Sequence, residues 1–210
     1  MLKMRKIETI LLIGALIFVL VACSGSRARM IQTQVEEKHA GKPIQNVLII
    51  AMMEDQEIRA ILENHYLDWL TVKGVEARTS HEVLPLDAAT RLEKEAIIEV
   101  LERYQNDTLL ITRGVGFGVT EVFSRDRPHF FYDFNGYYND AFGYIYWPTV
   151  TDEKVQLSIE TRLYDLKTEA LIWTGESQLT NPKTTGQAIG QIVELVMQEL
   201  EKNGLLPKSP

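Results

Sequence analysis

Apolar residues recur along this chain in spacings that predict alternating strands and helices. A continuous apolar run over residues 46–52 is typical of a strand covered on both faces. Three- and four-residue spacing predicts a helix after that strand, ending near Gly74, and two more at about 90–104 and 185–202. Further strands are expected over these ranges: 75–83, 108–115, 154–164 and 169–179.

The order of these elements predicts the fold class. Strands that alternate with helices pair in parallel, whereas two strands joined by a short turn at residues 165–168 form an antiparallel hairpin. We therefore expect an α/β fold with a single-layer mixed sheet of about five strands, in the order βαβα-βββ-α, and about three helices packed on it. One such domain would occupy residues 45–204.

The amino-terminal 22 residues have the pattern of a signal peptide. Lys3, Arg5 and Lys6 precede an uncharged apolar run over residues 10–22. A membrane-spanning helix needs about 20 apolar residues, so this run is too short to anchor the chain and suits a cleaved secretory signal. Residues 23–44 are polar without a clear apolar period, which predicts a flexible tether.

The end of this signal carries a family resemblance. Leu20-Val21-Ala22-Cys23 resembles the lipobox of bacterial lipoproteins. The resemblance implies lipidation of Cys23 and cleavage before it, and Ser24 is similar to the residue found in members sorted to the outer membrane. We expect a lipid-anchored protein of the cell envelope, at the outer membrane with its domain in the periplasm. The alternative is an unmodified cysteine in a short membrane helix.

Composition narrows the chemistry of the mature chain. Cys23 is the single cysteine, so disulfides and cysteine-based metal sites are not expected. The net charge is −7, and loss of the signal would remove three cations and one anion, leaving −9. A negative chain disfavours nucleic acid, whose binding depends on neutralising phosphates with Lys and Arg.

A second resemblance covers most of residues 45–202. The phrase NVLIIAM from Asn46, followed by a helix and then GVEARTSHEVLP from Gly74, is similar to the amino-terminal domain of TolB and to the curli-secretion lipoprotein CsgG. The hairpin LYDLKTEALIWTGES from Leu163 resembles the end of several envelope lipoproteins of unknown function. The pore-forming hairpins of CsgG are not evident here, so a secretion channel is not implied.

An aromatic-rich excursion is expected at residues 116–148. Twelve of the chain's eighteen aromatic residues lie between Phe117 and Trp147. The segment could fold back onto the sheet or extend the hairpin, it could form a partner surface, or it could insert into a membrane. The candidate partner surface consists of Phe130, Phe131, Tyr132, Phe134, Tyr137, Tyr138 and Phe142.

No catalytic, cofactor or metal constellation is apparent. Glycines 114, 116 and 118 do not form a dinucleotide fingerprint and are expected to share one strand face for close packing. The acidic and amide residues between 133 and 140 lack the glycine and glutamate spacing of a calcium loop. The four histidines are isolated in sequence: His39, His65, His81 and His129.

These observations predict a non-enzymatic envelope lipoprotein that serves as an accessory, assembly or protein-interaction module. Its expected partners are the membrane, through the lipid anchor, and other envelope proteins. The alternative function is binding of an envelope ligand such as a glycan through the aromatic segment. A third possibility is an enzyme whose carboxylates come together only in the fold.

Overall fold

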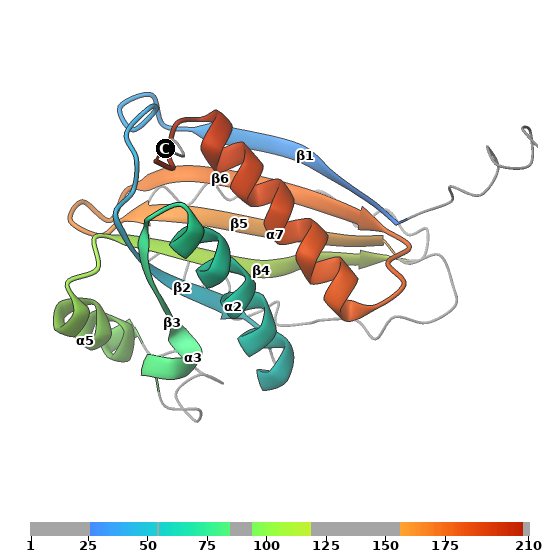
Figure 1. The fold of residues 1–210 in the computed structure, drawn as a ribbon, viewed down its shortest axis with the longest axis horizontal. Coiled ribbons are helices and arrows are strands. Elements are labelled where there is room, and N and C mark those ends of the chain that lie inside the picture. Colours follow the sequence, from blue (N-terminus) through green and yellow to red (C-terminus); the bar gives the residue numbers. More distant parts are fainter. Residues whose placement is uncertain (1–25, 54, 85–93, 119–155, 208–210) are drawn as a thin grey trace, which may run out of the picture.

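The protein is a mixed α/β domain built on one open sheet, as the sequence predicts. The computed structural model describes residues 26–53, 55–84, 94–118 and 156–207. Six described strands are arranged in the order β1-β6-β5-β4-β2-β3 (Figure 1). The strands are β1 (Arg27–Val35), β2 (Asn46–Met52), β3 (Glu76–Thr79), β4 (Thr108–Gly118), β5 (Gln156–Asp165) and β6 (Leu171–Thr180). The helices are α2 (Gln56–Val72), α3 (Ser80–Val83), α5 (Lys94–Tyr104) and α7 (Thr185–Lys202).

The sheet has a parallel half and an antiparallel half. Strand β2 pairs in parallel with β3 on one side and with β4 on the other. From β4 onward, each neighbouring pair through β5, β6 and β1 is antiparallel. The predicted alternation of strands with helices and the predicted hairpin therefore produce the two pairing types.

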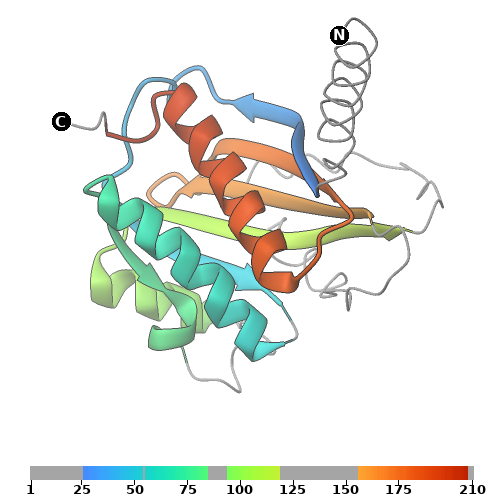
Figure 2. The ribbon, with the colours of Figure 1, turned by 45° about the vertical axis from the view of Figure 1, so that its right-hand side comes forward.

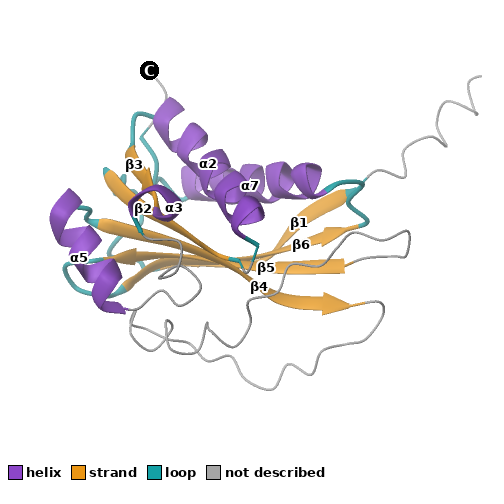
Figure 3. Ribbon diagram, turned by 90° about the horizontal axis from the view of Figure 1, so that it is seen from below, coloured by secondary structure: helices purple, strands orange, loops and turns teal. Residues whose placement is uncertain are grey.

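Helices cover the two faces of the sheet unequally. Helices α2 and α7 lie side by side across one face, and α5 lies on the opposite face against the parallel half (Figures 2 and 3). Because β2 lies between these helices, its side chains are buried on both faces of the sheet. Val47, Ile49 and Ala51 join the cluster under α2 and α7, whereas Leu48 and Ile50 join the cluster under α5.

Both long helices end in the same motif. After α2, Val75 N–H donates to the Leu70 carbonyl and Gly74 adopts φ +73°. After α7, Leu205 N–H donates to the Leu200 carbonyl and Gly204 adopts φ +69°. These are Schellman caps, in which a left-handed glycine lets the chain turn back and satisfy the last carbonyls.

The range 23–44, predicted as a flexible tether, contains a strand of the sheet. Residues Arg27–Val35 form the edge strand β1, paired antiparallel with β6. A bulge between Met30 and Gln32 shifts the alternation, so Ala28 and Met30 face the helices before it and Val35 faces them after it. This change of parity removes the period-two signal from the sequence.

Two further boundaries also differ from the prediction. The strand expected over 75–83 ends at Thr79, and Ser80–Val83 form a helical turn because Ser80 and His81 bind a buried carboxylate. The domain extends past residue 204, since Leu205 and Leu206 are buried.

Strand β4 continues into the expected excursion, as far as Gly118. Its register shifts between Gly114 and Gly116, so Gly114 pairs with Ile159 and Gly116 with Ser158. Ile159 and Ser158 are neighbours in β5 and therefore point to opposite faces of the sheet. Gly114 and Gly116, which pair with them, also lie on opposite faces, so the prediction that the three glycines share one face is wrong. No helix in the described part of the chain has the length and apolarity needed to cross a membrane.

A tryptophan on β6 requires a glycine two residues later. Trp173 is buried to 1% exposure and lies over Gly175 on the same strand. A Cβ added at Gly175 would meet the Trp173 ring at 2.3 Å. The indole would then have to leave a core that is packed on every side.

We expect Gly175→Ala to destabilise the fold by about 1–3 kcal/mol, since overpacking a filled core forces side chains off their preferred rotamers. Gly190→Ala is the matched control, because nothing lies within 4 Å of a Cβ at that helical position. That change is expected to stabilise α7 by up to about 1 kcal/mol. Denaturant unfolding of both variants measures the difference, and equal midpoints would contradict the steric argument.

Candidate functional site

The most deeply buried charges of the described chain lie in the first half of α2. Arg59 and Glu63 are both 0% exposed, and Arg59 Nε donates to Glu63 Oε1 at 3.1 Å. The Arg59 guanidinium also donates to Gln56 Oε1 at 3.1 Å and to Ser80 Oγ at 2.5 Å. Both residues lie on the helix stripe that otherwise carries Leu62, Tyr66 and Leu70 into the core.

Glu63 joins three elements through its two carboxylate oxygens. Oε1 accepts from the backbone N–H of Ala51 in β2 at 2.9 Å and from Ser80 Oγ at 2.5 Å. Oε2 accepts from the backbone N–H of His81 and lies 2.9 Å from His81 Nδ1. The site therefore lies at the carboxyl ends of parallel strands β2 and β3, the place where open α/β sheets usually bind ligands.

The hydrogen bonds keep Glu63 ionised. Burial alone would raise its pKa, but the His81 hydrogen bond, the Arg59 charge and the Ala51 and Ser80 donors outweigh it and lower the pKa below 4.5. The carboxylate is thus fully coordinated by donors, and it holds His81 with Nδ1 directed inward.

This cluster contains the residue types of a hydrolase site, but its serine is not accessible to a substrate. Ser80 is 0% exposed and its hydroxyl is already bonded to both Arg59 and Glu63. The His81 side chain, at 18% exposure, is the member of the group that solvent reaches best. A nucleophile must reach its base and its substrate together, and the described geometry instead makes this a cross-link between α2, β2 and α3.

A second ion cluster lies on the other face of the sheet. Glu160 of β5 accepts from Arg113 Nε at 2.9 Å through one oxygen and from Arg162 at 2.7 Å through the other. Burial would raise the pKa of Glu160, but the two guanidinium groups lower it. Arg162 also donates to the Tyr164 hydroxyl, and burial raises the pKa of Tyr164 to about 12.

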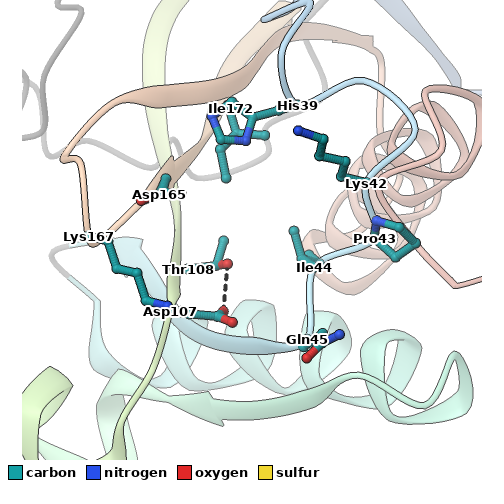
Figure 4. A pocket seen from close by; sticks show the side chains of 10 residues that line it. All are labelled: His39, Lys42, Pro43, Ile44, Gln45, Asp107, Thr108, Asp165, Lys167 and Ile172. Carbon is teal, nitrogen blue, oxygen red and sulfur yellow. Dashed lines mark hydrogen bonds between the residues drawn. The ribbon is translucent and has the colours of Figure 1, made fainter.

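A cavity of about 180 Å³ opens at the hairpin end of the sheet (Figure 4). The lining carboxylates have structural partners. Asp107 accepts from Asn46 N–H and the Thr108 hydroxyl, and Asp165 accepts from the N–H and hydroxyl of Thr168. Partial burial would raise the pKa of Asp165, but the Thr168 hydrogen bonds lower it.

The size of this cavity limits what it could hold. Ligand pockets usually enclose about 300–1,000 Å³, and a water molecule takes about 30 Å³, so the cavity suits a few waters. Its remaining polar side chains are those of His39, Lys42, Gln45 and Lys167. We therefore do not assign it as an active site.

The structure places the histidines predicted as isolated in three different settings. His39 lines the cavity, His65 is half-buried on α2, and His81 binds Glu63. His129, Cys23 and the seven candidate partner residues between Phe130 and Phe142 lie outside the described residues. Among described residues, no group of three or more His, Cys, Asp or Glu side chains is placed to hold a metal ion.

Sequence reasoning missed Arg59, Glu63 and Glu160. A signal for the first two exists: they occupy the apolar stripe of an otherwise amphipathic helix at a spacing of four residues. Opposite charges at that spacing on a buried face indicate an ion pair inside the core. Glu160 gives no such signal, because its partners come from β4 and from two residues along β5.

We expect Glu63→Gln to lower the stability by about 3–5 kcal/mol at neutral pH, because it leaves the Arg59 charge buried without a counterion. Glu99→Gln is the matched control, since Glu99 and Arg103 form an ion pair with the same four-residue spacing on an exposed face. That substitution should cost about 0.5 kcal/mol or less. Similar losses in both variants would contradict the assigned role of burial.

Wild type and Glu63→Gln also give a test of the pH dependence of stability. A carboxyl whose folded pKa lies below its unfolded pKa of 4.5 stabilises the fold above that pH and loses the contribution as pH falls through the folded value. The stability gap between wild type and Glu63→Gln should therefore be widest above pH 4.5 and narrow below it. Denaturant unfolding across this range measures the gap, and a pH-independent difference would contradict the lowered pKa.

Comparison with known proteins gives only distant likenesses. No protein-family model and no curated protein matches the chain. Among solved structures, two of the PelC dodecamer from Paraburkholderia phytofirmans align at TM-score 0.45, with 11% and 10% identity, over 87% of this chain and 99% of that chain. A PDZ domain protein from Parabacteroides distasonis aligns at TM-score 0.42 and 12% identity, over 83% of this chain and 36% of that chain. Likenesses at this level carry no argument about function.

Proposed function

We propose that this chain is a lipid-anchored lipoprotein of the cell envelope, with a non-enzymatic domain that serves as an accessory, assembly or protein-interaction module. The observation that carries the proposal is the sequence from Lys3 to Cys23: a basic start, an apolar run too short to span a bilayer, and a lipobox-like end. Acyl chains on one cysteine would hold the domain without a spanning helix. Each buried CH₂ contributes about 0.8 kcal/mol, and more than one chain is needed for a stable anchor.

The outer-membrane and periplasmic location, and the kinship with TolB-like and CsgG-like envelope lipoproteins, are parts of this proposal. They rest on Ser24 and on the phrases of sequence around Asn46 and Leu163. The mixed sheet with helices on it is compatible with that kinship, but a shared fold does not by itself carry a shared function.

The non-enzymatic assignment is supported by how the described polar clusters are used. Glu63 and Glu160 each receive donors on both oxygens, and their neighbours are buried in the same networks. Carboxylates held in this way stabilise one arrangement of the elements that they join. A carboxylate serving as acid or base would instead need an accessible position next to a substrate.

The alternative is a ligand binder that uses the aromatic residues between Phe130 and Phe142. The density of aromatics in that segment supports either a partner surface or a stacking surface for a glycan. The two functions separate experimentally. Recovery of envelope proteins with the intact lipidated protein favours the first, and retention of envelope glycans by the protein without such recovery favours the second.

We expect Cys23→Ser to abolish acylation. The wild-type protein should begin at residue 23 and carry acyl chains, whereas the variant, which lacks the sulfur, should incorporate no labelled fatty acid and keep its signal. Intact mass spectrometry of the protein purified from its native envelope measures both properties.

Ser24→Ala is the control, because it changes the next residue and leaves the sulfur in place. It should be acylated and cleaved like the wild type. A wild-type protein that starts at Met1 or carries a free thiol at position 23 would overturn the proposed function.

A further inference from the structure

The connection between β1 and β2, residues 36–45, is bound by the chain that leaves α7. Gly41 N–H donates to the Asn203 carbonyl at 3.0 Å, and Ile44 N–H donates to the Leu205 carbonyl at 2.9 Å. Figures 1 and 2 show the connection and the end of α7 side by side. Two segments from opposite parts of the sequence are thus paired through their backbones.

Residues 203–206, which we call the latch, are fixed in the hydrophobic core. Leu205 and Leu206 are 0% and 2% exposed, and both belong to the cluster that contains Ile44. Exposing either leucine would lose the free energy of burying a large apolar side chain. The latch is therefore a rigid support for the connection, although α7 has already ended.

The two segments approach so closely that the crossing requires glycine. Gly41 has φ +74° and Gly204 has φ +69°. A Cβ added at Gly204 would lie 2.8 Å from the Gly41 Cα, too close for two atoms that are not bonded. Gly74 ends α2 with φ +73°, but a Cβ at that position would meet nothing within 4 Å. The close approach at Gly204 is therefore additional to what a helix cap requires.

Strand β1 depends on support from its neighbours because it buries little of its own surface. None of the nine residues described for β1 is buried, and Ala28, Met30 and Val35 pack partly against the core. Its pairing with β6 relies on backbone hydrogen bonds. Each of these adds little net free energy, because water offers similar bonds when the strand opens.

The latch shortens the span of chain that must be ordered when β1 docks. Glu36 N–H is bonded to β6 at one end of the connection, and the Gln45 carbonyl is bonded to β3 at the other. With the latch closed, residues 37–40 bridge Glu36 and the first latched residue, whereas without it residues 37–44 would bridge the two ends. Doubling the length of a loop lowers its closure equilibrium about threefold.

We propose that residues 203–206 hold the connection against the core, favour the docked state of β1 and so link the end of α7 to the strand that follows Cys23. With β1 docked, residues 24–26 separate Cys23 from the sheet; with β1 open, residues 24–44 would do so. If Cys23 is acylated, the latch therefore controls how far the domain can move from its anchor. That consequence rests on the proposed function, whereas the latch rests on the contacts described above.

The test is amide hydrogen exchange of the full protein purified from its native envelope, as wild type, Gly204→Asn and Gly74→Asn. Asparagine tolerates the left-handed conformation better than most residues that have a Cβ. Each variant therefore chiefly adds a side chain at a helix cap. At Gly204 the new Cβ displaces the latch from Gly41, and at Gly74 it has free space.

In Gly204→Asn, the amides of Gly41 and Ile44 should exchange at least about tenfold faster than in wild type, because both latch hydrogen bonds are lost. The amides of residues 27–35 should exchange about threefold faster, because the span of chain after β1 is longer. In Gly74→Asn, all of these amides should exchange within about twofold of the wild-type rates, since local openings report on local contacts.

Equal exchange of residues 27–44 in the two variants would overturn the latch. Faster exchange confined to Gly41 and Ile44 would overturn its link to β1. Loss of protection spread evenly over the chain, with α2 and β5 included, would also count against the inference, because a latch predicts local opening. The intact mass of the same wild-type sample reports acylation, so a failure of the proposed function is seen separately.

Discussion

The fold depends on keeping β2 dry on both faces. Its residues from Val47 to Met52 are at most 3% exposed, so apolar groups must cover the sheet from above and below. Helices α2 and α7 supply one cover and α5 the other (Figure 3). At about 25 cal/mol per Å² of apolar surface buried, this cover on both faces contributes favourably to folding.

Buried charged residues of this domain connect different helices and strands. Glu63 binds backbone and side-chain donors from β2, α2 and α3, and Glu160 joins β4 to β5. Buried ion pairs add little net stability compared with apolar packing, but an unpaired partner is costly. Such a network therefore penalises any other register or helix position more than it rewards the native one. The charged residues of the core are consistent with a structural role, in keeping with the proposed non-enzymatic function.

The pairing of β1 with β6 links the fold to the proposed anchoring. An edge strand exposes unpaired backbone groups, and this one carries Arg27, Arg29 and a bulge, features that discourage pairing with other chains. The pairing brings residues 27–35 into the sheet, so these residues cannot serve as a flexible tether.

The sequence by itself determined the central elements: Asn46–Met52 and Thr185–Lys202 have the predicted bounds, because local apolar periodicity and capping residues define them. It also determined the mixed pairing, through the order of strands and helices. Only the tertiary structure decided that β1 belongs to the sheet, that β3 stops at Thr79 and that Arg59, Glu63 and Glu160 meet their partners. The physical reason is the same in each case. A bulge, a buried carboxylate and a cross-strand ion pair depend on residues far apart in the chain, and no local pattern records them.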